Sequence, residues 1–157
     1  MAHEILRITE QALDGTEQSI DCFAFVKGIV SPWHNLGQAV DREVGRQGRS
    51  DRLLLEAARG DFLVEKAELA HFHKGRPLKV DGSFVTRRAD TGRAFGVVSD
   101  RYNVIQNRDL YGIAEGVTAR LDNAGIITCG VLHGGATFFV QVDLGVRFEP
   151  LPGDEHQ

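Results

Sequence analysis

The sequence predicts an α+β fold, with a mainly antiparallel sheet of about five strands and two helices packed on one face. Strand-like runs follow one another across short glycine-containing turns at residues 89–92 and 133–135, which is typical of hairpins. Two other segments, 53–60 and 107–121, carry the apolar spacing of helices. Because hairpins rather than long crossovers join most strands, the pattern argues against a doubly wound parallel sheet.

Length and composition are those of one globular domain. The chain has 157 residues, of which 42% are hydrophobic and 25% charged. We expect a single domain over 1–157, with residues 1–19 and 150–157 peripheral. The two cysteines form no CxxC pair, the N-terminus is too polar for a signal peptide, and no apolar run approaches a membrane span. These features predict a cytoplasmic protein without a membrane partner.

The first half of the chain alternates weak strand signals with turns. Residues 23–26 form a short apolar run that predicts a strand. Pro32 and Gly37 then favour a structured turn over 31–37, and the polar, glycine-containing stretch 42–49 predicts a loop. A short helix follows from residue 53 and ends at Gly60. Residues 62–72 are interpreted as a strand that ends before Gly75 and Pro77.

The second half carries the clearest elements. Residues 83–88 and 93–98 predict two strands joined by the turn at 89–92. Asn107 can cap the clearest helix of the chain, and Gly125 follows its end. Residues 126–132 and 136–144 predict a second hairpin. The helix carries its apolar residues on one face, at Leu110, Ile113, Ala114, Val117 and Leu121.

Positive charge is concentrated between residues 71 and 108. This stretch has eight basic and three acidic residues, a net charge of +5 in a chain of net charge −4, so the remainder carries −9. A basic strip on an acidic protein predicts contact with an anionic partner, although solvated hairpin faces would give the same pattern. The nucleic-acid-binding candidates are Lys74, Arg76, Lys79, Arg87, Arg88, Arg93 and Arg101, with Tyr102 available for stacking.

No catalytic or cofactor site is predicted. The glycine-rich stretches lack the Lys-Ser or Lys-Thr of a phosphate loop, and Ser99 lies in no Gly-x-Ser-x-Gly turn. His71 and His73 point to one side of a strand and could hold a metal, but they need a third ligand. His34, His133 and Asp100 are only loose candidates for it, and two surface histidines near the end of a hairpin explain the pair better. We therefore predict no metal site.

The segment 99–106 connects a strand to the best helix and is rich in hydrogen-bonding side chains. Asp100, Arg101, Tyr102 and Gln106 could form a polar staple at this corner. Alternatively, Arg101 and Tyr102 could contact a ligand or a nucleic acid through charge and stacking. We favour the staple, in which Asp100 and Arg101 hold the fold.

Two motifs resemble a known family. The chain reads Pro-Trp-His-Asn-Leu-Gly over 32–37 and Gly-Arg-Ala-Phe-Gly-Val-Val-Ser-Asp-Arg-Tyr-Asn-Val-Ile-Gln over 92–106. Over residues 20–157 it resembles the N-terminal half of the phage/plasmid-like proteins grouped as domain of unknown function 932, whose members continue further. The matching residues, which we interpret as structural, are Pro32, Trp33, His34, Leu36, Gly37, Gly96, Ser99, Asp100, Arg101, Tyr102 and Gln106.

The resemblance implies an accessory protein of a mobile element, associated with DNA replication, recombination or counter-defence. The leading hypothesis is a non-catalytic protein that binds DNA, single-stranded rather than double-stranded. A second hypothesis is a module that binds host or phage proteins. A third is a metal-dependent hydrolase using His71 and His73. The sequence leaves oligomer formation open.

Overall fold

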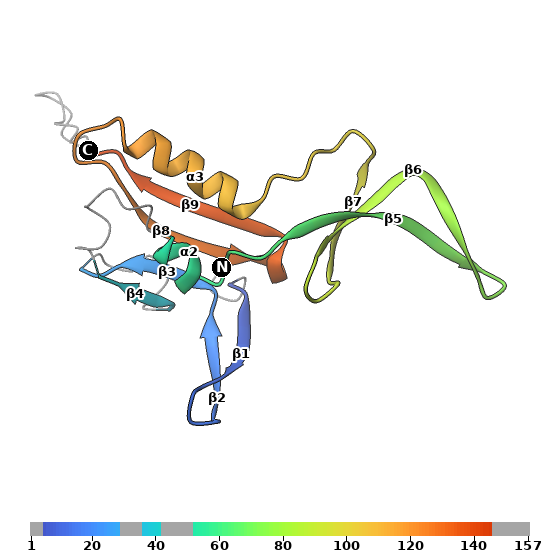
Figure 1. The fold of residues 1–157 in the computed structure, drawn as a ribbon, viewed down its shortest axis with the longest axis horizontal. Helices are drawn as coiled ribbons and strands as arrows, with labels where there is room; N and C mark the ends of the chain where they lie inside the picture. Colours follow the sequence, from blue (N-terminus) through green and yellow to red (C-terminus); the bar gives the residue numbers. More distant parts are fainter. Residues whose placement is uncertain (1–4, 29–35, 42–51, 146–157) are drawn as a thin grey trace, which may run out of the picture.

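The computed structural model describes residues 5–28, 36–41 and 52–145, and strands dominate it (Figure 1). Four strands form the central sheet in the order β4-β3-β8-β9. They are β4 (Gln38–Val40), β3 (Phe23–Val26), β8 (Gly125–Leu132) and β9 (Thr137–Asp143). All neighbours in this sheet are antiparallel except β3 and β4, which run parallel. We call this unit, with its two helices, the helix-bearing sheet.

Both helices lie on the same face of this sheet. Ala24 of β3 and Cys129 of β8 are register partners, so their side chains point to one face. Leu54 and Leu55 of α2 (Leu53–Ala57) and Tyr111 of α3 (Asn107–Thr118) belong to the same buried cluster. The predicted placement of two helices on one face is therefore confirmed.

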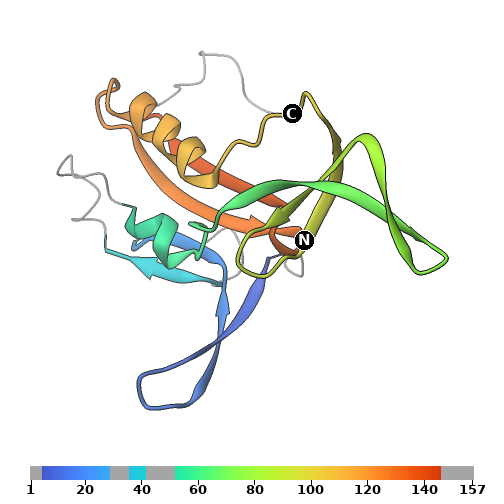
Figure 2. The same ribbon diagram turned by 45° about the vertical axis from the view of Figure 1, so that its right-hand side comes forward.

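A second sheet projects from this body as a long arm (Figures 1 and 2). We use the name arm for β5 (Val64–His73), β6 (Arg76–Arg88) and β7 (Ala94–Ser99), which pair antiparallel in that order. β7 pairs with β6 only over 83–87, so the outer half of the arm is a two-stranded ribbon of β5 and β6. At the inner end, Val64 and Phe95 pack against a cluster containing Phe62 and Val131. The arm is thus anchored at its base alone.

A third, smaller hairpin projects in another direction (Figure 1). It consists of β1 (Arg7–Gln11) and β2 (Glu17–Asp21). The chain runs almost directly from β2 into β3, and Cys22 N–H donates to the carbonyl of Leu6. Arg59 forms two hydrogen bonds to the Glu10 carboxylate, which hold the hairpin against the segment after α2.

Several sequence-based expectations need correction. The described residues contain nine strands in three sheets, rather than about five in one sheet. The strand expected over 83–88 begins at Arg76, because its outer half pairs with β5 alone and tolerates Pro77 there. The N-cap of α3 is Gln106 rather than Asn107. The turn predicted at 31–37 falls mostly outside the described residues, as does the loop at 42–49, but Gly37 has φ +94° as expected.

The apolar face of α3 is the least expected feature. Asn107, Tyr111, Ala114 and Thr118 form the half of the helix that turns toward the sheet. Of the predicted apolar stripe only Ala114 lies in this half; the rest is exposed to solvent, at Leu110, Ile113, Val117 and, one turn beyond, Leu121. None of the helices in the described part of the chain is long and apolar enough to cross a membrane.

Candidate nucleic-acid interface

Half of the basic strip is neutralised by carboxylates. Glu65 and Glu68 lie on β5 and meet cations of β6 across the hairpin, because antiparallel pairing brings these positions together. Lys79 is hydrogen-bonded to Glu68, which raises the pKa of this lysine. The remaining pairs are Arg87–Glu65 at 2.7 Å, Arg88–Asp90 at 2.7 Å and Arg108–Asp61 at 3.1 Å.

These pairs change the charge of the candidate surface. Asp61, Glu65 and Glu68 precede the basic strip in the sequence. Glu65 and Glu68 lie on β5 of the arm, and Asp61, just before β5, pairs with Arg108 of α3. Over residues 61–108 the chain has nine basic and six acidic residues, a net charge of +3. The excess of cations remains but is smaller than the strip alone indicates. Lys79, Arg87, Arg88 and Arg108 are thereby weaker candidates for contact with an external anion.

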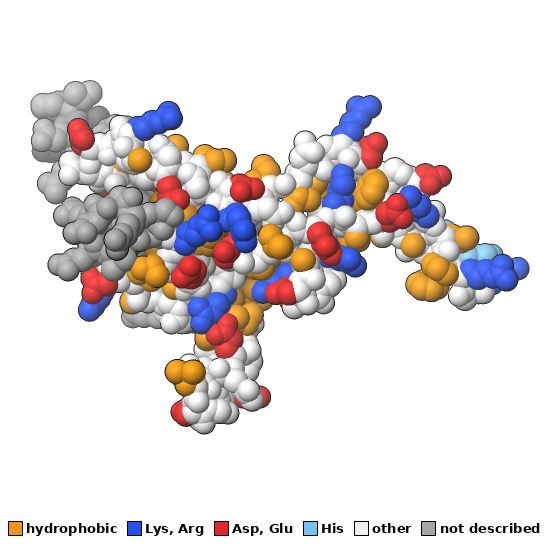
Figure 3. Space-filling model, viewed as in Figure 1, with side chains coloured by type: hydrophobic (Ala, Val, Ile, Leu, Met, Phe, Trp, Pro, Cys, Tyr) orange, Lys and Arg blue, Asp and Glu red, His pale blue; other side chains and the backbone are white. Residues whose placement is uncertain are grey.

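Two unpaired cations lie at the tip of the arm. Lys74 is in the turn between β5 and β6, and Arg76 opens β6; neither has a carboxylate partner among the described residues. The register pairs His73 with Arg76, so these two side chains share a face with His71. Figure 3 shows basic and histidine side chains together at this end of the molecule. The tip therefore presents positive charge well away from the acidic residues of the body.

An exposed aromatic ring lies on the opposite face of the tip. Phe72 pairs with Pro77 in the register, and 76% of its surface is exposed. A phenyl ring so exposed contributes nothing to a core in this chain. It offers a flat apolar surface at the same end of the arm as Lys74 and Arg76, on the other face of the ribbon, and exposed aromatic rings are surfaces on which unpaired bases stack.

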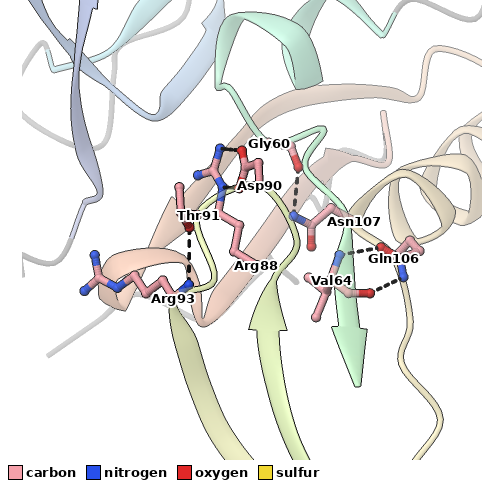
Figure 4. A network of polar contacts seen from close by, with 8 residues as sticks. All are labelled: Gly60, Val64, Arg88, Asp90, Thr91, Arg93, Gln106 and Asn107. Atoms are coloured by element: carbon pink, nitrogen blue, oxygen red, sulfur yellow. Dashed lines mark hydrogen bonds and ion pairs between the residues drawn. The ribbon is translucent and has the colours of Figure 1, made fainter. Parts of the chain in front are cut away.

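Arg93 lies at the other end of the arm. It follows the β6–β7 turn, and its backbone N–H donates to the Thr91 hydroxyl at 3.4 Å (Figure 4). Its guanidinium sits beside Gly134 of η2 (His133–Gly135), where a Cβ would lie 2.1 Å from Nη2. Arg93 therefore does not belong to the cationic tip, although no carboxylate in the described segments pairs with it.

The corner over 99–106 is stapled by Gln106, as expected, and by Lys66, which the sequence did not indicate. Lys66 Nζ donates to the backbone carbonyls of Asp100 at 2.6 Å and Tyr102 at 3.0 Å. Gln106 accepts from the Val64 N–H at 2.9 Å and donates to its carbonyl at 2.8 Å, as Figure 4 shows. Its side-chain amide thus forms the two hydrogen bonds to Val64 that a neighbouring strand would form with β5.

The adjacent residue completes this anchor. Asn107 is buried, and its Nδ2 donates to the carbonyl of Gly60 at 2.8 Å (Figure 4). Gln106 and Asn107 together attach the N-terminus of α3 to the start of β5. By contrast, the Asp100 and Arg101 side chains form no hydrogen bond or ion pair within the described residues. The prediction that these two side chains hold the fold is therefore not supported.

The corner leaves Arg101 and Tyr102 available to a partner. Both are exposed, with 48% of the Tyr102 surface open to solvent. The hydrogen bonds from Lys66 fix the backbone of this loop, so the two side chains extend from a segment with a defined position. Together with the tip, they give the arm two unpaired cationic and aromatic positions.

The residues of the two motifs quoted from the sequence differ in their structural roles. Gln106 has a structural role, and so does Gly37, whose Cβ would lie 2.5 Å from the Phe23 carbonyl oxygen. Leu36 is half-buried, and the Ser99 carbonyl accepts from Tyr102 N–H at 3.2 Å. A Cβ at Gly96 would meet no atom within 4 Å, so packing does not explain this glycine. Pro32, Trp33 and His34 lie outside the described residues.

Among the described residues, two kinds of reactive group bear on catalysis, a metal cluster and a thiol. The described residues contain no cluster of three or more His, Cys, Asp or Glu that could hold a metal ion, so His71 and His73 gain no third ligand there. Burial raises the pKa of the Cys22 thiol to about 11 and that of Cys129 to about 12. Neither thiol is therefore ionised at neutral pH, and neither is a ready nucleophile.

Comparison with known proteins does not extend this picture. No protein-family profile matches the chain, and no curated protein or solved structure matches it significantly.

Sequence reasoning also missed two features of the site, Lys66 and Phe72. Lys66 precedes the basic strip by five positions, and only the fold brings it beneath the corner. Phe72 carries a hydrophobic side chain, which normally predicts burial.

Proposed function

We propose that the protein is a non-catalytic accessory protein that binds single-stranded nucleic acid through its arm. The observation that carries this proposal is the distribution of unpaired cations. Ion pairs occupy the middle of the arm, whereas Lys74, Arg76 and Arg101 remain unpaired at the tip and the corner. Each of these positions also has an exposed aromatic side chain, Phe72 or Tyr102.

This combination fits single strands better than duplex DNA. Cations at the tip and corner neutralise phosphates, which supplies affinity without sequence preference. Exposed rings then stack on bases, and bases are accessible for stacking only where the strand is unpaired. We also propose membership of the family of phage/plasmid-like proteins named above, which places this binding in the DNA metabolism of a mobile element.

Fluorescence polarisation with a labelled single strand and a duplex of equal length tests the proposal at two salt concentrations. We expect tighter binding to the single strand, weakening steeply as salt increases. The double variant Lys74→Gln/Arg76→Gln should reduce the log–log salt slope by about 1.4, because each phosphate contact contributes about 0.7. Tyr102→Leu should cost about 1–3 kcal/mol of single-strand binding while leaving that slope unchanged.

The matched control is Lys27→Gln/Arg52→Gln, which removes the same charge from exposed positions outside the arm. It should retain most of the affinity and leave the salt slope unchanged. Equal losses in the two double variants would mean that only net charge matters, which contradicts a binding surface on the arm. Absence of binding to either nucleic acid at low salt would overturn the proposed function itself.

A further inference from the structure

The outer face of α3 is an exposed apolar stripe on the surface of the helix-bearing sheet. Ile113 is 61% exposed and Val117 is 47% exposed, and Leu110 is next to them on the helix. Tyr111 packs into the core cluster and Asn107 hydrogen-bonds to the carbonyl of Gly60, so within the described residues α3 is held by side chains outside the stripe. An apolar helix face of this kind is typical of a contact surface.

Two glycines beside the stripe support this interpretation. Gly112 and Gly116 lie one turn apart on α3, and a Cβ at either would meet no atom within 4 Å. Glycine in a helix interior lowers the stability of the helix relative to alanine. Nothing within the described chain explains why glycine occupies these two positions. A second helix that approaches closely would explain it, because a side chain at these positions would hold the two backbones apart.

The charges beside the stripe indicate what the second helix is. Asp109 lies in the first turn of α3 and Arg120 just beyond its last turn, and neither forms an ion pair within the described residues. The two are placed almost symmetrically about Ala114. Gly112 and Gly116 are centred on the same residue, and Leu110 and Val117 nearly so. The face is therefore self-complementary under reversal of the helix direction.

We propose that two copies of the chain associate through α3 as an antiparallel helix pair, with a two-fold axis close to Ala114. In this arrangement Asp109 of each copy faces Arg120 of the other, which gives two equivalent intermolecular ion pairs. The glycines of the two copies lie opposite each other on one side of the contact, and Leu110 meets Val117 on the other side. Ile113 lies between these two rows, at the centre.

The size of the contact sets its expected strength. One helix pair buries less surface than a standard stable interface, so the dimer should be weak and should form in a concentration-dependent manner. The two proposals rest on different residues, because Lys74, Arg76, Arg101 and Tyr102 all lie outside α3. Their tests use different variants, so failure of one proposal leaves the other standing.

Sedimentation velocity of the full chain over a range of concentrations measures this association. We expect a monomer–dimer equilibrium that Ile113→Glu weakens at least about tenfold, because two carboxylates would be buried at the centre of the contact. The control is Val97→Glu, which makes the same type of change at a 64% exposed apolar position on the arm. It should leave the dimer unchanged. A monomer at every concentration, or a dimer that Ile113→Glu leaves intact, would overturn the proposal.

Charge reversal provides a second test that does not depend on the apolar stripe. Asp109→Arg and Arg120→Asp, made singly, each place like charges opposite each other at both ends of the helix pair and should weaken the dimer. The double variant restores opposite charges, so its dissociation constant should return to within about threefold of the original. Circular dichroism melts of all four proteins check that α3 is retained. Additive weakening in the double variant would overturn the antiparallel arrangement.

Discussion

The helix-bearing sheet and the arm are stabilised in different ways. In the sheet, side chains such as Phe23, Leu55 and Val131 are completely buried, and both helices contribute to one core. In the arm, Thr86 is the only buried residue among the three described strands, and Phe72, Leu78 and Val97 are exposed. The arm instead relies on its backbone ladder and on exposed ion pairs, each of which contributes at most about 1 kcal/mol.

This difference separates a region that a core stabilises from a region that stays paired without one. Core packing fixes the sheet, while the arm needs only to stay paired and to keep its direction. Long ribbons without a core are marginal alone, so the arm depends on its base, where Phe62, Val64 and Phe95 pack against the body. Substitutions in the two regions should therefore differ both in size and in what they change.

The largest expected effect is in the core of the sheet. Leu55→Ala should lower the free energy of unfolding by about 2–5 kcal/mol, because it leaves a cavity at a completely buried position. Leu78→Ala makes the same change on the arm at a 45% exposed position and should cost less than about 0.5 kcal/mol. Urea unfolding followed by circular dichroism measures both. Equal losses would contradict the contrast between the two regions.

An intermediate effect is expected where the regions join. Gln106→Ala removes both hydrogen bonds to Val64 and should cost about 1–3 kcal/mol, because the N–H and carbonyl of Val64 lose their partner. Hydrogen exchange should show faster exchange at the start of β5 than in β8. Gln11→Ala, an exposed position in β1, provides the control. Unchanged exchange at Val64 would show that Gln106 does not anchor the arm.

The smallest expected effect is on the pH dependence of the free energy of unfolding. The hydrogen bond from Arg88 holds the pKa of Asp90 below its ordinary value of 3.8. Since the folded-state pKa is depressed, the pair contributes stability above 3.8 and loses it as the pH falls through the lower folded value. Asp90 is largely exposed, so the contribution should be below about 1 kcal/mol. Urea titrations of the parent protein and Asp90→Asn should differ at neutral pH and converge in strong acid. A constant difference would contradict this assignment.

Sequence reasoning succeeded where the signal was local. The turn at 89–92 and the helix from residue 107 were predicted because turn residues and apolar spacing act over a few positions. The polar strands β1 and β2 were missed, since neither has an apolar run. Pro77 was interpreted as the end of a strand, but it lies in the outer ribbon, where a missing donor is tolerated.

The candidate site was only partly predictable. The basic strip contains the unpaired cations of the tip and corner, but a count along the chain cannot show which of them face a carboxylate. That depends on the register of β5 against β6, which sets Glu65 opposite Arg87. The same limit applies to α3. Its spacing predicted an apolar stripe, but the sheet contacts the half of the helix that carries Tyr111 and Asn107 instead.

Because the arm is long, a small change of angle at its base moves its tip over a much larger distance. β6 has 13 residues, so at about 3.3 Å per residue it can reach roughly 40 Å from its attachment. A tilt of about 10° at the base would then move Lys74 and Arg76 through about 7 Å. The Gln106 amide and the apolar contacts of the base therefore determine where these two distant cations lie relative to the body.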